Sequence, residues 1–429
     1  MAAPDKHPTS PGSSVAVQSR STPQRRIALG TFPALEIPTY RRYLISLMAA
    51  HFGMHNQEIV RAWLAYNLHQ SAGEASLVVL MSAVGQGIGA PLGGVAADRF
   101  DRRRITMSMQ AVMFAAAALV GVLVILNVIE LWHLLMLALV TGGAGSLHAP
   151  ARQSLVFNLV GPKHVSNALA INSGVASVTT LVGPAIAGLV IATVGVGPAY
   201  FCSVAAFAIS IATLRGIVEG APRRIADERE SLFRSMTGGA RYLFRQKPLF
   251  WLFIISCGGI MIGHPFRNNM SPFAVEALNG GPGTFGVLLS LIGLGAVGAG
   301  IFIAAISDYK NKGNLLIWSG VAWGLAIVAL SQAPNLLVAV PILLVIGVSQ
   351  MFFQVMTNIG LQTNVEDAYR GRILSFHVMS FSLSGITALL LGYATDWAGV
   401  RPAFLGLGLI LFAFVAVMGF WRKDVRTME

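Results

Sequence analysis

The stretch GGVAADRFDRRR, residues 93–104, places six charged side chains between two long apolar runs. An Arg or Asp at the centre of a bilayer costs roughly 2.5 to 3.5 kcal/mol on insertion scales, so these side chains cannot lie in hydrocarbon. The stretch is therefore predicted to be a tight loop at a membrane face. It constrains the fold because both flanking apolar segments must end on the same side of the membrane.

The composition supports a membrane protein. Hydrophobic residues make up 55% of the 429 residues and charged residues only 11%, which is too apolar for an ordinary soluble domain. About 20 apolar residues cross the hydrocarbon core as a helix. That length predicts an all-α integral membrane fold with twelve spans, at about 42–68, 75–97, 104–127, 131–156, 164–194, 198–217, 249–277, 284–307, 314–333, 336–361, 371–396 and 400–421.

The basic residues follow the predicted topology. Of the 30 Lys and Arg residues, 27 lie in the termini, in the loops after every second span, or in the ends of spans next to them. By the positive-inside rule, both termini are expected in the cytoplasm and the protein in the cytoplasmic membrane. The net charge of +12 is therefore spread between spans, and no nucleic-acid partner is expected.

An internal repeat divides the chain into two halves. The segment AGLVIATVGVGPAY at 187–200 recurs as LGYATDWAGVRPAF at 391–404, which matches Gly188 to Gly392 and Gly195 to Gly399. Six spans per half in the same sense predict a parallel duplication. The expected units are a disordered cytoplasmic tail (1–40), two six-helix bundles (41–217 and 248–422), a linker (218–247) and a cytoplasmic tail (423–429).

The linker contains an amphipathic segment, residues 231–247. Its basic side suits an anionic inner leaflet, so membrane lipids are expected partners. A plain tether that carries positive charge is the alternative interpretation.

Residues 93–104 resemble the loop between helices 2 and 3 of the major facilitator superfamily, with a Gly, three spacers, Asp-Arg and a basic cluster. Residues 149–173 and 365–376 resemble cytoplasmic segments of the enterobactin-exporter-like branch, which contains siderophore and drug exporters. The resemblance implies a monomeric transporter with two parallel-repeat bundles and rocker-switch alternating access. It implies no enzyme activity and no cofactor.

The resemblance also implies a cytoplasmic latch. Asp98 would meet the cytoplasmic end of the span at 371–396, whose helix N-terminus carries partial positive charge. Alternatively, these charges only mark topology. The residues assigned to this gating latch are Asp98, Arg99, Arg102, Arg103, Arg370 and Arg372.

In the fifth span, TLVGPAIAG resembles the Gly-Pro motif of antiporters, with Gly183, Pro184 and Gly188 in place. Thr179 and Ala187 stand where the usual pattern has glycines. The motif would thin and bend this helix for close packing. Ordinary small-residue packing explains it equally.

A polar face in the first span is the main candidate for ion coupling. Glu58 is the one acidic residue well inside a span, and His55 precedes it by one turn. We expect these two residues to carry the coupled proton. The alternative is an inert ion pair between the halves, with Arg61 or Arg267 as the partner.

The substrate cavity is expected between the halves, where the seventh span repeats the polar pattern of the first. A neutral amide stripe beside soft Met side chains in the tenth span suits amphiphilic ligands, although packing explains it as well. The assigned substrate-cavity residues are Arg61, His264, Arg267, Asn268, Asn269, Met351, Gln354 and Asn358.

No P-loop and no metal-ligand spacing is present in the sequence, and Cys202 and Cys257 are expected to be buried free thiols. A proton gradient is therefore the expected energy source. The sequence predicts a proton-coupled exporter of small amphiphilic molecules such as drugs or siderophores. An importer or a lysophospholipid or lipid translocase of the same fold, and a non-transporting membrane sensor, are the alternatives.

Overall fold

The computed structural model describes residues 33–217, 232–305 and 311–421, without the side chains of a few helical residues that include Asp98, Arg99 and Arg370. The predicted tail at 423–429, most of the predicted tail at 1–40 and the first half of the linker lie outside the described residues. So do the side chains of three of the six predicted latch residues.

The described chain is helical. Its elements are η1 (Pro33–Glu36), α1 (Pro38–His69), α2 (Ala72–Arg99), α3 (Arg102–Ile125), α4 (Leu131–Val194), α5 (Val196–Arg215), α6 (Leu232–Arg245), α7 (Lys247–Gly263), α8 (Pro265–Asn268), α9 (Met270–Pro272), the π-helical η2 (Phe273–Ala277), α10 (Pro282–Ala305), α11 (Lys312–Ser331), α12 (Leu336–Thr363), α13 (Asp367–Ala398) and α14 (Val400–Trp421).

Ten of the described helices are long and apolar enough to cross a membrane. α4 counts once among them, yet its 64 residues bend at Gly161, where φ is 69° and Pro162 follows, so it supplies two spans. α1 has 32 residues but is less apolar because it carries the polar face with Glu58. With these two corrections the described helices provide the twelve predicted spans, and the all-α membrane fold is confirmed.

The predicted seventh span, 249–277, is not one continuous helix. α7 ends at Gly263, and the short elements α8, α9 and η2 follow. Pro265 has no N–H to donate to the preceding turn, and the next turns close through shorter bonds, from Arg267 N to His264 O and from Asn269 N to Phe266 O. The break changes the direction of the side chains that follow it.

The described chain includes helical residues from the segment 1–40, which is predicted to be a disordered tail. η1 packs on α4 because Ala34 is fully buried and its N–H donates to Asn167 Oδ1 at 3.3 Å. The predicted tail is therefore too long by several residues. An amphipathic helix within the linker is also present, as α6.

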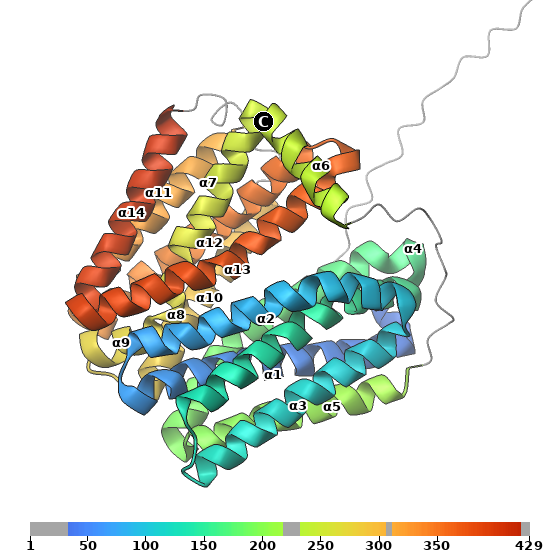
Figure 1. Ribbon diagram of the computed structural model, residues 1–429, viewed down its shortest axis with the longest axis horizontal. Coiled ribbons are helices and arrows are strands. Elements are labelled where there is room, and N and C mark those ends of the chain that lie inside the picture. Colours follow the sequence, from blue (N-terminus) through green and yellow to red (C-terminus); the bar gives the residue numbers. More distant parts are fainter. Residues whose placement is uncertain (1–32, 218–231, 306–310, 422–429) are drawn as a thin grey trace, which may run out of the picture.

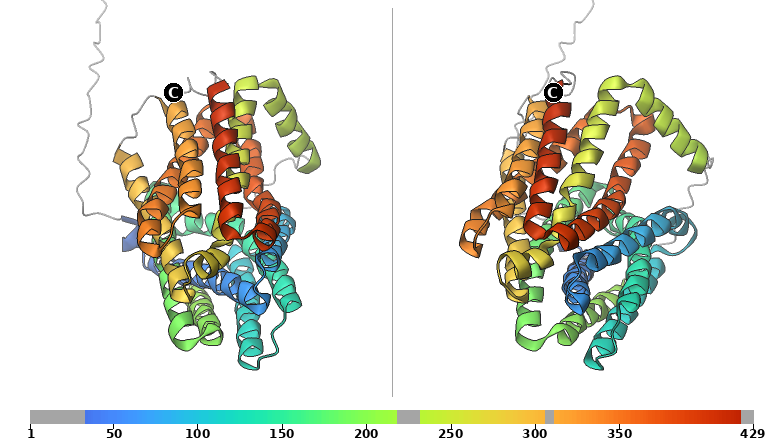
Figure 2. Two further views of the ribbon diagram at one scale, coloured as in Figure 1. Left: turned by 90° about the vertical axis from the view of Figure 1, so that its left-hand side faces the viewer. Right: turned by 60° about the vertical axis from the view of Figure 1, so that its left-hand side comes forward.

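The two halves form separate bundles, with α1–α5 in one and α7–α14 in the other (Figure 1). They lie against each other near α8 and α9 and diverge toward α6, which lies outside the second bundle (Figure 2). The repeat is visible in the backbone. Gly195, between α4 and α5, and Gly399, between α13 and α14, have φ angles of 94° and 90°, which favour glycine.

The described halves touch mainly through two helix pairs, α2 with α13 and α4 with α10, and α1 also contacts α9. Both main pairs need glycine. A Cβ on Gly392 would lie 2.5 Å from Ala72 O, and a Cβ on Gly188 would lie 2.8 Å from Gly286 Cα. These repeat-related glycines therefore hold the same kind of position, each against a helix of the other half.

Candidate transport cavity

A cavity of about 300 Å³ lies between the two halves. Apolar side chains form much of its wall, and a few polar groups from both halves converge on it, which is typical of a small-molecule site. Its lining includes His55, Glu58, Arg61, Ser82, Gln86, Thr180 and Pro184 from the first half and His264, Arg267, Asn268, Phe285, Leu289, Phe381 and Ser384 from the second.

Glu58 and His55 lie within ion-pair distance of each other on the cavity wall. The distance from Glu58 Oε2 to His55 Nδ1 is 3.4 Å, and the carboxylate-bearing side chain is 58% exposed to the cavity. The other ring nitrogen of His55 lies 3.4 Å from Thr180 Oγ1 on α4. The two predicted proton-coupling residues are therefore adjacent. The His55 ring is held between Glu58 and Thr180 of α4.

Two arginines, one from each half, line the same cavity. Arg61 donates from Nη1 to Thr141 Oγ1 at 3.1 Å and so points toward α4. None of the described acidic groups lies within the 4.0 Å ion-pair distance of Arg267. Glu58 interacts electrostatically with both guanidinium groups without forming an ion pair with either. The inert ion pair of Glu58 with Arg61 or Arg267, which was the alternative interpretation, is thus not formed in this conformation.

His264, at the break after α7, anchors the cavity wall of the second half. Its Nε2 lies 3.1 Å from the Gln350 side-chain amide, and its ring packs edge-on against Phe381 and Trp323. The missing helical bond at Pro265 leaves Arg267 and Asn268 facing the cavity. The interruption of the helix after α7 therefore places three of the predicted substrate residues, His264, Arg267 and Asn268, on the cavity wall.

A second cavity, of about 480 Å³, continues from the first within the wall of the first half. Glu58, Arg61, Ser82 and Gln86 line both cavities. The second adds soft and amide side chains, with Met54, Gln57, Met113 and Gln153 among them. Glu58, the one acidic residue in either described lining, therefore lies where the two cavities join.

Four predicted substrate residues do not line either described cavity. Asn269 is 1% exposed and accepts a hydrogen bond from Ser76 of α2 at 3.4 Å, so the broken helix turns it into the contact between halves. Asn358 donates to Gln354 O within α12 at 2.9 Å, and Met351 approaches Gly300 of α10. The amide stripe thus contributes mainly Gln350, through His264.

Three of the predicted latch residues, Arg102, Arg103 and Arg372, have described side chains. Arg103 donates to Arg215 O at 2.7 Å, and Asp101 caps α3 by accepting from Arg104 N at 2.7 Å, both within the first half. Arg372 lies over the Tyr369 ring at 5.3 Å and packs against Gly239 of α6. The side chains of Asp98, Arg99 and Arg370 lie outside the described residues, so the latch stays a prediction.

The Gly-Pro motif of the fifth span lies at two boundaries. Gly183 faces His55 of α1, and Pro184 lines the cavity. Gly188 faces α10, where a Cβ on Gly286 would in turn lie 2.6 Å from Pro184 O. The motif therefore lets α4 approach α10 closely beside the cavity.

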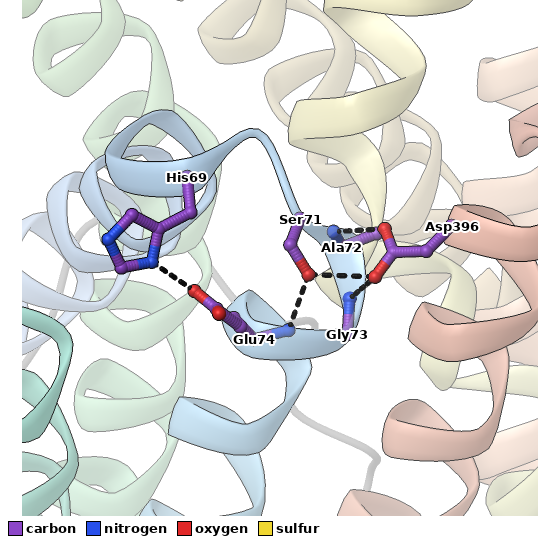
Figure 3. Close-up of polar contacts among 6 residues, drawn as sticks. All are labelled: His69, Ser71, Ala72, Gly73, Glu74 and Asp396. Atoms are coloured by element: carbon purple, nitrogen blue, oxygen red, sulfur yellow. Dashed lines mark hydrogen bonds and ion pairs between the residues drawn. The ribbon is translucent and has the colours of Figure 1, made fainter.

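Asp396, at the end of α13, is a candidate functional residue that no sequence pattern predicted. Its carboxylate accepts hydrogen bonds from Ser71 Oγ at 2.7 Å, Ala72 N at 2.7 Å and Gly73 N at 2.9 Å (Figure 3). These donors form the N-terminus of α2 in the other half. We call this contact the Asp396 clasp. Within the internal repeat, only the second copy, residues 391–404, contains an acidic residue. That asymmetry was the only signal for Asp396 in the sequence.

Among the described residues no group of three His, Cys, Asp or Glu side chains could hold a metal ion. Cys202 and Cys257 are free thiols of intermediate exposure.

The model of the transmembrane secretion effector family matches residues 29–429, which is most of the chain. The chain belongs to this family of major facilitator transporters. The predicted fold and the absence of an enzyme class are thereby confirmed, and this transmembrane secretion effector is a multi-pass membrane protein and a secondary transporter.

Relatives of this chain include proteins named as efflux pumps. It is 28% identical to the multidrug efflux pump Tap of Mycobacterium tuberculosis over 388 residues, which cover 87% of this chain and 90% of the pump. Tap of Mycolicibacterium fortuitum is 24% identical over 83% of this chain and 89% of its own length. Macrolide efflux protein A of Streptococcus pyogenes is 19% identical over 86% and 93%.

Solved structures support the fold of this family member. The nucleoside transporter NupG has a TM-score of 0.73 at 12% identity and covers 91% of this chain and 100% of its own. A bacterial homologue of the lysosomal transporter Spinster, in an inward-facing conformation, has a TM-score of 0.71 at 12% identity and covers 91% of this chain and 98% of its own. At these identities the likeness concerns the fold alone.

Proposed function

We propose that this transporter exports small amphiphilic molecules from the cytoplasm in exchange for protons. The observation that carries the proposal is the position of Glu58. This carboxylate is paired with His55, exposed to the cavity, and lies where the two cavities join. A titratable acid at membrane depth is costly, so its presence there indicates a function. Glu58 lies where both protons and ligands can reach it.

Exchange follows from competition at this carboxylate. A cationic or hydrogen-bond-donating group of a ligand is stabilised by ionised Glu58 and loses that partner when Glu58 is protonated. A proton and a ligand therefore exclude each other at one site, which links their movements in opposite directions. Inward movement of one proton releases about 2.3 kcal/mol of free energy per 100 mV of membrane potential, and this energy can drive the export of a ligand.

The ligand class follows from the lining. Met54 and Met113 offer an adaptable apolar surface, and the glutamine side chains beside them offer neutral hydrogen bonds. The names of the relatives refer to drugs and macrolides, which favours drug-like amphiphiles over siderophores. Both termini are proposed to be cytoplasmic, so the end where the halves diverge opens toward the cytoplasm and can load a ligand from there.

Membrane lipids are proposed partners of α6. Its Leu243 is buried against the bundle, whereas Phe244 is 69% exposed and Arg241, Arg245 and Lys247 lie at the surface. An apolar ring flanked by basic groups fits an anionic lipid surface. We propose that the transporter acts as a monomer, because the cavity is completed by the two halves of one chain.

The test uses inverted membrane vesicles with an acid interior and the fluorescent dye ethidium as probe. The protein should accumulate the dye inside the vesicles, and Glu58→Gln should lower gradient-driven accumulation by about tenfold or more, since each tenfold corresponds to about 1.4 kcal/mol. Exchange of dye down its own gradient should persist in Glu58→Gln. Glu74→Gln is the matched control, because Glu74 is a surface carboxylate that pairs with His69 outside both cavities.

Three results would contradict the proposal. Accumulation that needs no proton gradient would exclude antiport. Equal loss in Glu58→Gln and Glu74→Gln would remove the specific role of Glu58. Accumulation only when the gradient is reversed would show import.

A further inference from the structure

The N-terminus of α2 is capped by the other half of the molecule. Ser71 accepts from Glu74 N at 3.1 Å and so satisfies one donor of the first turn. The N–H groups of Ala72 and Gly73 instead donate to Asp396, which lies more than 320 residues away in sequence (Figure 3). A helix N-terminus leaves such donors unpaired within the helix and carries partial positive charge, so a carboxylate there is stabilised twice.

The surroundings fit this carboxylate closely. A Cβ on Gly73 would lie 2.7 Å from the Tyr393 ring and 2.9 Å from Asp396 Oδ2. A Cβ on Gly392, one turn before Asp396, would lie 2.5 Å from Ala72 O and from Ser76 Oγ. The two helices therefore approach to backbone contact at the clasp, and a side chain at either glycine would separate them.

The clasp can also open without a large penalty. Asp396 is exposed and Ser71 half-buried, so water can replace the three hydrogen bonds when the halves part. The other described polar bonds across the halves near this end use one donor each. They run from the Tyr66 hydroxyl to Glu276 Oε1 at 2.9 Å, from Ser76 Oγ to Asn269 Oδ1 at 3.4 Å and from Ser271 Oγ to Ala62 O at 3.4 Å. Three bonds to one charged group make Asp396 the main polar contact at this end.

We infer that Asp396 is a gating residue of the transport cycle, which holds the end of the molecule opposite the linker closed and releases α2 when that end opens. The inference rests on the alternating access of the proposed function. It assigns the opening step to the loss of three specific hydrogen bonds. Their loss should raise the population with this end open, because only the closed form contains them.

Distances between spin labels on the full-length protein in lipid nanodiscs test the inference. With Cys202 and Cys257 replaced by Ser, labels at Val128 and Leu337, both exposed, report on the clasp end. Labels at Lys163 and Thr363, also exposed, report on the linker end. In Asp396→Asn the ratio of open to closed clasp end should rise about tenfold or more, and the linker-end distance should shorten.

Glu74→Gln is the matched control. Glu74 lies in the same first turn of α2, but its carboxylate pairs with His69 of the same half at 2.5 Å (Figure 3). In Glu74→Gln, the ratio of open to closed clasp end should stay within twofold of its value in the parent protein. Gly73→Ala gives a second test that keeps Asp396, with Gly87→Ala as its control, because a Cβ on Gly87 meets open space.

Unchanged distances in both Asp396→Asn and Gly73→Ala would overturn the inference, and so would an equal shift in Glu74→Gln. The proposed function fails separately. If the clasp-end distance shifts as expected but the parent protein shows no gradient-driven dye transport, the gate stands and the export proposal falls. If transport is gradient-driven and the distances do not respond, only the gate falls.

Discussion

The two main contacts between the halves, α4 with α10 and α2 with α13, occupy equivalent places in the repeat but differ in chemistry. At Gly188 the described contact is backbone against backbone, with Pro282 O and Gly286 Cα as the nearest atoms. At Gly392 the same close approach is followed, one turn later, by the Asp396 clasp. One contact is apolar and the other ends in charge-assisted hydrogen bonds.

This difference separates two tasks. An apolar glycine contact has no directional bond to break, so it can roll as the halves rock and still stay packed. A carboxylate on helix N–H groups is directional and either formed or lost. We therefore interpret α4 with α10 as the pivot and α2 with α13 as the lock. The following predictions test that division, from the largest expected effect to the smallest.

Gly188→Val should have the largest effect, because a side chain there collides with the α10 backbone. Overpacking of a tight contact costs about 1 to 3 kcal/mol, which can reverse a two-state equilibrium of similar size. We expect transport to fall below a tenth and the spin-label distances at both ends to change. Gly174→Val, at an open position of α4, should transport normally. Normal transport in Gly188→Val would refute the pivot.

Asp98→Ala tests whether the α2–α13 pair is locked at its other end as well. α2 and α13 run antiparallel, so Asp98 near the end of α2 is placed toward the beginning of α13. We expect normal membrane insertion and a several-fold lower turnover in vesicles, with the linker-end distance shifted toward the open form. Unchanged turnover would leave the charges of residues 93–104 as topology markers only.

Ser71→Ala removes one of the three donors of the clasp while the two backbone donors remain. A hydrogen bond to a charged group contributes about 1.5 to 3 kcal/mol when protected and less at a wet surface, so a three- to tenfold rise in the open clasp end is expected. Raising the salt concentration should reduce the difference from the parent protein, because salt screens the exposed Asp396 carboxylate. A change as large as that of Asp396→Asn would show that the hydroxyl, and not the helix N-terminus, dominates the clasp.

Tyr66→Phe should have the smallest effect. It removes the hydroxyl bond to Glu276 but keeps the ring, which is buried. We expect less than a threefold shift in the clasp-end populations, or under about 1 kcal/mol. A larger shift would mean that the lock is shared between the two carboxylates.

Patterns along the sequence predicted the spans, the repeat and the residues of the cavity that lie close together in one helix. Glu58 and His55 are one turn apart, so any helix places them side by side. Gly195 and Gly399 were aligned by the repeat, and both adopt positive φ. The helix break at Pro265 within the predicted span 249–277 was not predicted, because propensity alone does not say how far neighbouring helices support the freed backbone groups.

Contacts between distant segments could not be predicted in the same way. Asn269 has the same polarity as Asn268, yet it faces Ser76 while Asn268 faces the cavity, because one residue around a broken helix changes the side. Asp396 resembled any acidic residue at the end of a span. Its partners are backbone N–H groups, which leave no trace in side-chain chemistry, so no motif search of the sequence identifies them.

The sequence by itself determined that this chain is a twelve-span membrane protein of two repeated halves, because apolar length, charge distribution and glycine spacing act locally or along one helix. The tertiary structure alone decided which helices join the halves, that they part at the linker end, and that Asp396 caps α2. Those facts depend on how the two similar bundles pack against each other. Moving one bundle relative to the other leaves the interactions within each bundle almost unchanged, so the free energies of the alternative arrangements differ little. Function as a transporter depends on that small difference.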